Sequence, residues 1–170
     1  TSIRRRCASS WPRNWRGAEA MTGELVIRPA RLPDAPAMVD LLNAIIARGG
    51  TTAHREPFDV DRMIADYIAP ARGIACHVAE RNGAILGFQA LEWTDPDWDG
   101  ANPLPADWAL VATFVAIGAQ GGGVGSCLFA ATREAARAAG VRMIDATIRR
   151  ENQGGLAYYS RMGFEDYWSD

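Results

Sequence analysis

Residues 119–127, AQGGGVGSC, constrain the fold of this chain more than any other segment. They follow WALVATFVAI (108–117), a nearly continuous apolar stretch that predicts a buried strand. They lead into VGSCLFAATREAARAAG (124–140), which predicts an amphipathic helix that ends at a glycine. This order brings unpaired backbone N–H groups and the positive end of a helix dipole to one point. Because glycine leaves the backbone uncovered there, the segment predicts an anion-binding site, with a flexible hinge as the alternative.

Two well-known phosphate-binding loops do not fit this segment. The dinucleotide fingerprint needs glycines at i, i+2 and i+5. Counted from Gly121 the last position is Ser126, and counted from Gly123 it is Leu128. A P-loop needs Gly-Lys-Ser/Thr, and all 18 basic residues of the chain are arginines. The lack of lysine also excludes a Schiff-base mechanism.

The composition predicts one ordinary globular domain. The chain has 170 residues, of which 48% are hydrophobic and 22% are charged, enough for a single core. A net charge of −2 argues against a nucleic-acid partner, which would require a basic surface. No run of about 18 apolar residues predicts a membrane span. The three cysteines are widely spaced and predict free thiols in a reducing, cytoplasmic compartment, with no metal site.

Turn residues and apolar periodicity divide the remaining chain into strands and helices. Asn82–Gly83 predicts a type I′ hairpin turn. Residues 1–22 are predicted to be an N-terminal extension, irregular or ordered only by packing on another surface, and residues 23–170 to be the domain. The predicted strands are 25–30, 73–81, 84–93, 108–117 and 141–148, and the predicted helices are 34–48, 59–70, 124–140 and 152–162.

The glycine segment fits a third pattern, V-x(4)-Q-G-x-G-x-G, which runs from Val115 to Gly125. It resembles the acyl-CoA loop of the GCN5-related N-acetyltransferases, the GNAT family. A second pattern of that family, N-x(6)-Y-x(3)-G-F, runs from Asn152 through Tyr159 to Phe164. Gly155 stands where the family usually has alanine. The two patterns occur in order, separated by a helix and a strand, and together they identify the chain from residue 25 onward as similar to this family.

The resemblance implies an α/β fold: a mixed, mostly antiparallel sheet, splayed at a cofactor slot, with helices on both faces. Acetyl-CoA would be the co-substrate, with no metal. The backbone of residues 113–115 would pair with the pantetheine arm like an added strand, and the N–H groups of residues 121–126 would hold the pyrophosphate. Asn152 would contact the cofactor or serve only as a helix cap. The implied cofactor-binding residues are Thr113, Phe114, Val115, Gln120, Gly121, Gly122, Gly123, Val124, Gly125, Ser126 and Asn152.

The same resemblance implies direct attack of an amine on the thioester. The backbone N–H of Val115 would stabilise the oxyanion. Tyr159 matches the general acid that protonates the departing thiolate, with plain packing as the alternative, and its neighbour Tyr158 should point elsewhere. Glu92 and Asp107 are the candidates for the base, with solvated turn residues or a water as the alternatives.

The first helix and the loop after it resemble the phosphinothricin and amino-acid N-acetyltransferase branch. This resemblance implies an acceptor site formed by Thr52, His54, Arg55 and Trp93, with Arg55 clamping a carboxylate. We therefore predict acetyl transfer to the primary amine of an amino-acid-like small molecule, with no nucleic-acid or membrane partner. A protein amine as acceptor and a non-catalytic acyl-CoA-binding or regulatory module are the alternatives.

The end of the chain departs from the family pattern. The family continues into a last strand pair, but only six residues follow Phe164. The C-terminal strand pair is therefore predicted to be truncated. Its place would be left empty, or be taken by the N-terminal extension or by a partner subunit in a homodimer.

Overall fold

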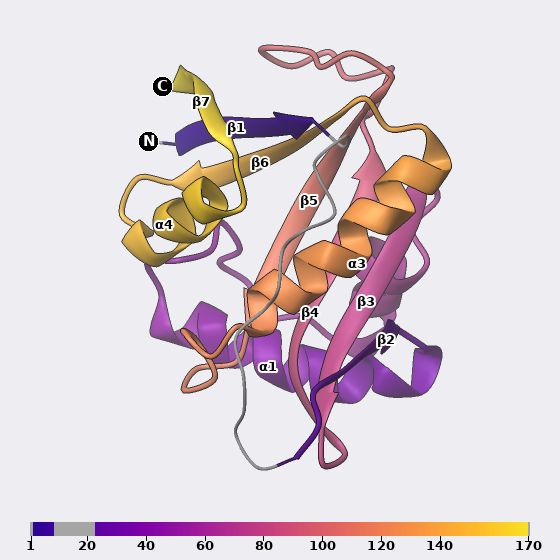
Figure 1. The fold of residues 1–170 in the computed structure, drawn as a ribbon, viewed down its shortest axis with the longest axis vertical. Helices are drawn as coiled ribbons and strands as arrows, with labels where there is room; N and C mark the ends of the chain where they lie inside the picture. Colours follow the sequence, from indigo (N-terminus) through magenta and orange to yellow (C-terminus); the bar gives the residue numbers. More distant parts are fainter. Residues whose placement is uncertain (1, 9–22, 170) are drawn as a thin grey trace.

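The computed structural model describes residues 2–8 and 23–169, which form a seven-stranded sheet with helices on both faces (Figure 1). This confirms the predicted fold class. The strands are β1 (Ser2–Ala8), β2 (Val26–Pro29), β3 (Gly73–Arg81), β4 (Ala84–Trp93), β5 (Trp108–Val115), β6 (Met143–Arg149) and β7 (Glu165–Ser169). The α-helices are α1 (Ala35–Arg48), α2 (Val60–Met63), α3 (Val124–Ala139) and α4 (Gln153–Arg161), with a 3-10 turn η1 (Leu32–Asp34) and a π-helix η2 (Ile64–Ile68).

The strand order is β2-β3-β4-β5-β6-β1-β7, and every neighbouring pair is antiparallel except β5 with β6. The parallel pair runs only from Trp108–Met143 to Leu110–Asp145. Beyond these residues β5 and β6 continue without pairing to each other, which is the predicted splay of the sheet (Figure 1). The slot between the two strands is the main departure from a regular sheet.

Residues 2–8 form β1, which lies inside the sheet. It pairs with β6 over its whole length, from Ser2–Arg149 to Ala8–Met143, and with β7 on its other side. The sequence predicted that the extension is irregular or is ordered only by packing on another surface. For residues 2–8 the second expectation holds, and the surface is the sheet of the domain itself. The N-terminal segment therefore occupies the place beside β6, and β7 was not predicted from the sequence. Residues 9–22 of the predicted extension lie outside the described residues.

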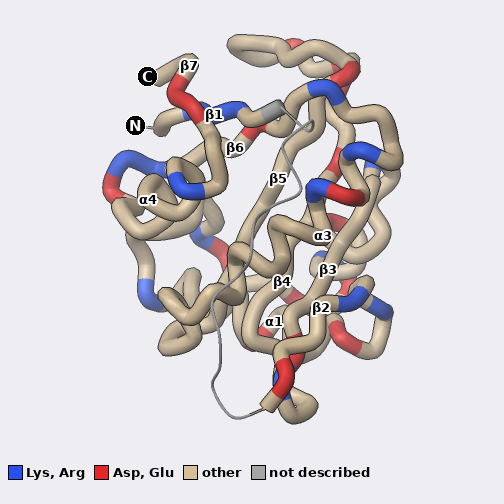
Figure 2. Tube along the Cα trace, viewed as in Figure 1, with Lys and Arg blue, Asp and Glu red and all other residues tan. Residues whose placement is uncertain are grey.

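Charge and side-chain contacts fix β1 between its neighbours. Figure 2 shows basic residues on β1 beside acidic residues on β7. Arg5 is buried, and its guanidinium forms an ion pair with Asp166 of β7. On the same face it donates to the Leu156 carbonyl and the Ser160 hydroxyl, both at 2.6 Å. Arg5 thus links β1 to β7 and to α4.

Two apolar clusters pack against opposite faces of the sheet. One lies under α3 and α4 and includes Leu91, Phe129 and Ile144. The other lies under α1, α2 and η2 and includes Leu42 and Phe88. Because side chains alternate along a strand, neighbouring residues of β4 and β5 belong to different clusters. The slot therefore opens to the α3 and α4 cluster on one face of the sheet and to the α1, α2 and η2 cluster on the other.

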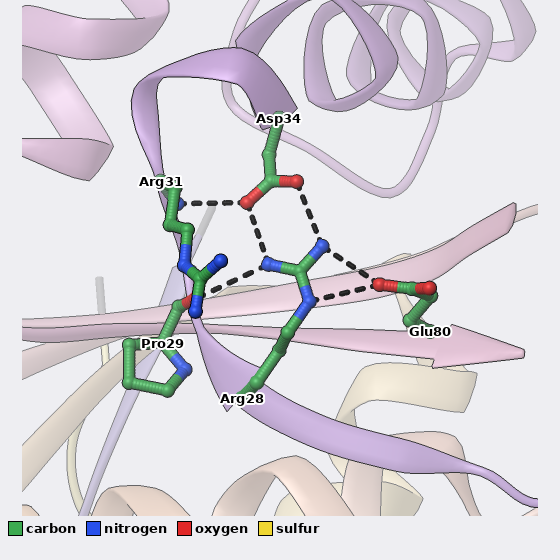
Figure 3. A network of polar contacts seen from close by, with 5 residues as sticks. All are labelled: Arg28, Pro29, Arg31, Asp34 and Glu80. Carbon is green, nitrogen blue, oxygen red and sulfur yellow. Dashed lines mark hydrogen bonds and ion pairs between the residues drawn. The ribbon is translucent and has the colours of Figure 1, made fainter. Parts of the chain in front are cut away.

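The start of α1 is joined to the sheet by a polar network (Figure 3). The Arg28 guanidinium of β2 donates to both carboxylate oxygens of Asp34 at 2.8 Å and to Glu80 of β3. Asp34 also accepts a hydrogen bond from the Arg31 backbone N–H at 2.7 Å. The Arg28 guanidinium is the main cause that holds the pKa of the Asp34 carboxyl below its ordinary value.

Replacing Asp34 with asparagine is expected to lower the free energy of unfolding at pH 7 by about 2 kcal/mol, because a paired, mostly buried carboxylate is lost. A lowered folded-state pKa gives stability that is present above the ordinary pKa and lost as the pH falls through the folded value. The difference between wild type and Asp34→Asn should therefore shrink below about pH 4. Urea unfolding across pH checks this. Asp40→Asn, at an exposed position of α1, serves as the control, and an equal loss in both variants would contradict the assignment.

Candidate active site

The backbone of β5 offers hydrogen-bonding groups to the slot. Ala116 N–H donates to the Leu86 carbonyl at 2.8 Å, and Thr94 N–H donates to the Trp108 carbonyl at 3.2 Å. Because hydrogen-bonded and non-hydrogen-bonded pairs alternate in an antiparallel ladder, even-numbered residues of β5 bond to β4 and odd-numbered residues face the slot. Thr113 and Val115 therefore direct their N–H and C=O groups toward the slot.

Phe114 corrects the sequence analysis in one respect. It was predicted to offer its backbone to the pantetheine arm, but it pairs with Phe88 of β4. By the alternation of the ladder, its N–H and C=O face that strand. Its ring packs on the α1 side of the sheet, with centroids 5.5 Å from Tyr67 and 6.2 Å from His54. Phe114 thus contributes a side chain to the other side of the slot instead of backbone groups.

The glycine segment leads from the end of β5 to an open helix N-terminus. Gly121 and Gly123 adopt φ values of +82° and +81°, which favour glycine. Gly123 is the N-cap of α3 and gives no side-chain cap, and no acidic residue lies in the first helical turn. The first N–H groups of a helix lack intrahelical acceptors, so this turn can bind an anion. The Gln120 amide is within 3.4 Å of the Val115 carbonyl and joins the segment to β5.

The structure explains the glycine at position 125 but not the one at position 122. A Cβ at Gly125 would lie 2.9 Å from the ring of Tyr158, whose hydroxyl donates to the Gly125 carbonyl at 2.8 Å. Tyr158 was expected to point away from the site, but it packs against the start of α3. Gly122 has no positive φ, and a Cβ there would meet only the Ala119 carbonyl at 3.4 Å. Nothing in the structure explains the glycine at 122.

Tyr159 is buried on the α4 side of the slot. Its hydroxyl lies 2.8 Å from the Thr113 hydroxyl, on the strand whose backbone faces the slot. The Gln89 amide donates to Thr113 at 2.6 Å and to the Tyr158 hydroxyl at 3.2 Å, so the two tyrosines join one network. Burial raises the pKa of Tyr159 to about 12. The phenol therefore keeps its proton throughout the neutral range.

Asn152 is the N-cap of α4. Its side-chain oxygen accepts from the Gly155 N–H at 2.8 Å, and its amide donates to the Thr51 carbonyl at 2.9 Å. A Cβ at Gly155 would lie 2.6 Å from this amide, which explains a glycine where the family usually has alanine. The capping role predicted for Asn152 is present, and its contact with a cofactor stays a prediction.

A cavity of about 240 Å³ lies on the opposite side of the slot, between η2 and strands β4 to β6. Glu92 lines it, and burial raises the pKa of this carboxyl. The Glu92 side chain forms no hydrogen bond or ion pair with any described residue. Asp107, the other candidate base, is paired with Arg142 at 2.8 Å and does not line the cavity. The lining residues are Asp66, Tyr67, Pro70, Ala90, Leu91, Glu92, Leu110, Val111, Ala112, Asp145 and Thr147.

The predicted acceptor residues lie in different places. The His54 ring nitrogen Nε2 is 2.6 Å from the hydroxyl of Tyr67, which lines the cavity, and Thr52 accepts from the His54 N–H at 3.2 Å. Burial is the main cause that lowers the pKa of His54. Arg55 is exposed and does not line the cavity. Trp93 packs against the cluster under α3 and α4, on the other face, and so leaves the set of proposed acceptor residues.

Of the lining residues, only Glu92 was a candidate in the sequence, and the polar residues that were not predicted include Tyr67 and Asp145. Asp145 carries a visible signal, because it is the acidic residue within the apolar strand segment MIDATI.

In the described part of the chain, no three His, Cys, Asp or Glu side chains are grouped to hold a metal ion. The helices within residues 23–169 are all too short or too polar to cross a membrane.

Comparisons with known proteins agree with this geometry. A family model described as an acetyltransferase (GNAT) domain matches residues 72–166, more than half of the chain. The fold is similar to an N-acetyltransferase from Staphylococcus aureus Mu50, with a TM-score of 0.72 and 25% identity over 84% of each chain. A search of curated proteins found no match.

Two further solved structures differ in the acceptor that they name. One is a putative phosphinothricin N-acetyltransferase, with a TM-score of 0.68 and 27% identity over 85% of this chain and 86% of that one. The other is a ribosomal-protein-alanine N-acetyltransferase from Brucella melitensis, with a TM-score of 0.69 and 26% identity over 83% of this chain and 85% of that one. The family match, together with the splayed sheet and the glycine turn before α3, shows that this chain belongs to the GNAT acetyltransferase family.

Proposed function

We propose that this chain transfers the acetyl group of acetyl-CoA to a primary amine of a small molecule. The observation that carries the proposal is the slot between β5 and β6. Its β5 edge directs backbone groups into the slot, its α3 end has an open helix N-terminus, and its other side has a partly open cavity. This arrangement separates a site for an extended thioester from a site for an amine.

The cofactor side is assigned to the groups that fit each part of acetyl-CoA. The backbone of Thr113 and Val115 would bond the amides of the pantetheine arm, as an added strand would. The N–H groups of residues 121–126 would hold the pyrophosphate at the start of α3, aided by the helix dipole. The membership of the family and the absence of acidic residues from the first turn of α3 support this assignment.

The chemistry follows from which residues lie on each side of the slot. Acetyl-CoA supplies a thioester, whose carbon–sulfur bond is exchanged for a carbon–nitrogen bond. Glu92, on the cavity side, would accept the proton that an ammonium must lose before it attacks. A backbone N–H at the β5 edge would stabilise the oxyanion, and Tyr159, on the α4 side, would donate a proton or a hydrogen bond to the departing sulfur. The raised pKa of Glu92 makes it a better base than an ordinary carboxylate.

The size of the cavity favours a small acceptor over a protein. A volume of about 240 Å³, lined by residues of η2 and three strands, suits a short molecule. A protein N-terminus would also fit if only its first residue entered, so peptide amines belong in the test.

The proposal is tested by two measurements on the full chain. Saturating CoA should raise the melting temperature by about 5 °C or more, as expected for a ligand at about 100 times its Kd. Acetyl-CoA with a panel of small amines and an alanine peptide should release free thiol, fastest with a small amine. Stabilisation without thiol release from any amine would favour the non-catalytic binding module. No stabilisation by CoA would contradict both functions.

A further inference from the structure

A row of three side chains crosses the cavity side of the slot. Glu92 of β4 pairs with Leu110 of β5, and Leu110 pairs with Asp145 of β6. Paired residues in neighbouring strands direct their side chains to the same face, so the two carboxylates flank Leu110 with their Cα atoms about 10 Å apart. All three residues line the cavity. The row places two acids at the closed end of the slot, where the pairing of β5 and β6 stops.

Asp145 has an unsatisfied oxygen. Its side chain is fully buried, and Oδ1 accepts a hydrogen bond from the Tyr167 hydroxyl. Oδ2 has no hydrogen-bond partner among the described residues, and the Arg4 guanidinium nitrogen Nε lies 3.7 Å from it. A buried carboxylate oxygen without a donor costs free energy. A ligand that brings a donor into the cavity would remove this cost.

Every charged residue that lines the cavity is acidic: Asp66, Glu92 and Asp145. Among the arginines around it, Arg4 forms a long ion pair with Asp145 itself at 3.7 Å, and three others are directed to other groups. Arg62 pairs with Asp66 at 3.3 Å on the exposed side, and Arg72 pairs with Asp95 at 3.1 Å. Arg149 donates to the Thr52 carbonyl at 3.3 Å and pairs with Glu151. No lining residue therefore offers a cation to a carboxylate.

We propose that the acceptor is a small aliphatic diamine, whose attacking amine lies at Glu92 and whose second ammonium is held by Asp145. This inference rests on the proposed function. An ammonium carries three donors and no acceptor, which suits the unpaired carboxylate of Glu92 and the Asp145 Oδ2, which has only the long ion pair with Arg4 and no hydrogen bond. The reaction is the same transfer: one nitrogen forms the amide, the carbon–sulfur bond breaks, and the other nitrogen keeps its charge. An acceptor with a carboxylate would meet like charge in this cavity. The inference replaces the amino-acid-like acceptor that the sequence predicted.

Three acceptors of equal length test this in the full, CoA-loaded chain. 1,4-Diaminobutane, 1-aminopentane and 4-aminobutanoate each have a chain of six heavy atoms, and they end in an ammonium, a methyl and a carboxylate, respectively. Calorimetric titration at neutral pH should give a Kd for the diamine at least about tenfold lower than for the monoamine, with the amino acid weakest. Equal or tighter binding of 4-aminobutanoate, or equal binding of the diamine and the monoamine, would overturn the proposal.

A variant locates the second ammonium. Asp145→Asn should remove the preference for the diamine over the monoamine while leaving the monoamine Kd within about twofold, and Glu134→Gln, at an exposed position of α3, should keep the preference. Unchanged preference in a folded Asp145→Asn chain would contradict the assignment. If this variant does not fold, the three-ligand series on the unaltered chain decides alone.

Thiol release separates this inference from the proposed function. Turnover of 4-aminobutanoate without turnover of the diamine would leave the acetyltransferase standing and overturn the diamine site. Diamine binding without thiol release from any amine would leave the site standing and overturn the proposed reaction.

Discussion

Replacing Gly123 with valine is expected to weaken the binding of acetyl-CoA by about 100-fold or more, which corresponds to about 2.7 kcal/mol. Gly123 lies at φ +81° directly before α3, and a Cβ built there meets nothing within 4 Å. That open space is where the proposed pyrophosphate would approach the helix N-terminus, so the valine side chain would occupy the path of the ligand. The Kd measured by calorimetry checks the prediction.

The control for this variant lies at the other end of the same helix. Gly140 ends α3 with φ +77° and also has open space around a Cβ. Valine at either position pays a similar cost for a left-handed backbone, about 1–3 kcal/mol of stability. Gly140→Val should therefore lose similar stability and still bind acetyl-CoA normally. If both variants lose binding alike, or if Gly123→Val binds normally, the proposed pyrophosphate site is wrong.

Local signals in the sequence predicted most elements of the fold. Strands 73–81 and 84–93 occur with the predicted bounds, and the turn between them has positive φ at Asn82 and Gly83, as a type I′ turn requires. The position of β1 could not be predicted in the same way. SIRRRCA lacks a clear apolar alternation, and its place depends on pairing with β6 about 140 residues away. Its basic charge beside β7 becomes informative only when the partner strand is known.

The two sides of the candidate site also differ in how far the sequence predicts them. The cofactor side rests on contiguous motifs, so the glycine turn and Tyr159 could be found from the sequence. The acceptor side depends on the register of three strands, which brings Asp145 level with Glu92. The separation of Glu92 from Trp93 follows from the sequence alone, because neighbours in a strand direct their side chains to opposite faces of the sheet.

Replacing Tyr159 with phenylalanine is expected to lower kcat by about 100-fold, or about 2.7 kcal/mol in the barrier, while KM for acetyl-CoA stays within about twofold. Its buried hydroxyl lies beside Thr113 at the slot, on the side opposite Glu92. The pKa of about 12 lies above the ordinary pKa of a thiol, about 8.5. Full proton transfer to the sulfur is therefore uphill, and the hydroxyl would act mainly as a hydrogen-bond donor to the leaving thiolate.

The high pKa of Tyr159 also determines how kcat should depend on pH, and Tyr158→Phe is the comparison variant. Because Tyr159 keeps its proton up to about pH 12, kcat should not fall between pH 8 and pH 10 through this group, whereas a tyrosine with an ordinary pKa near 10 would begin to titrate there. Tyr158→Phe removes a hydroxyl from the same network, but one that bonds the Gly125 carbonyl at the start of α3. It should therefore raise KM for acetyl-CoA more than it lowers kcat. A loss of kcat in Tyr158→Phe with normal kcat in Tyr159→Phe would reverse the roles of the two tyrosines.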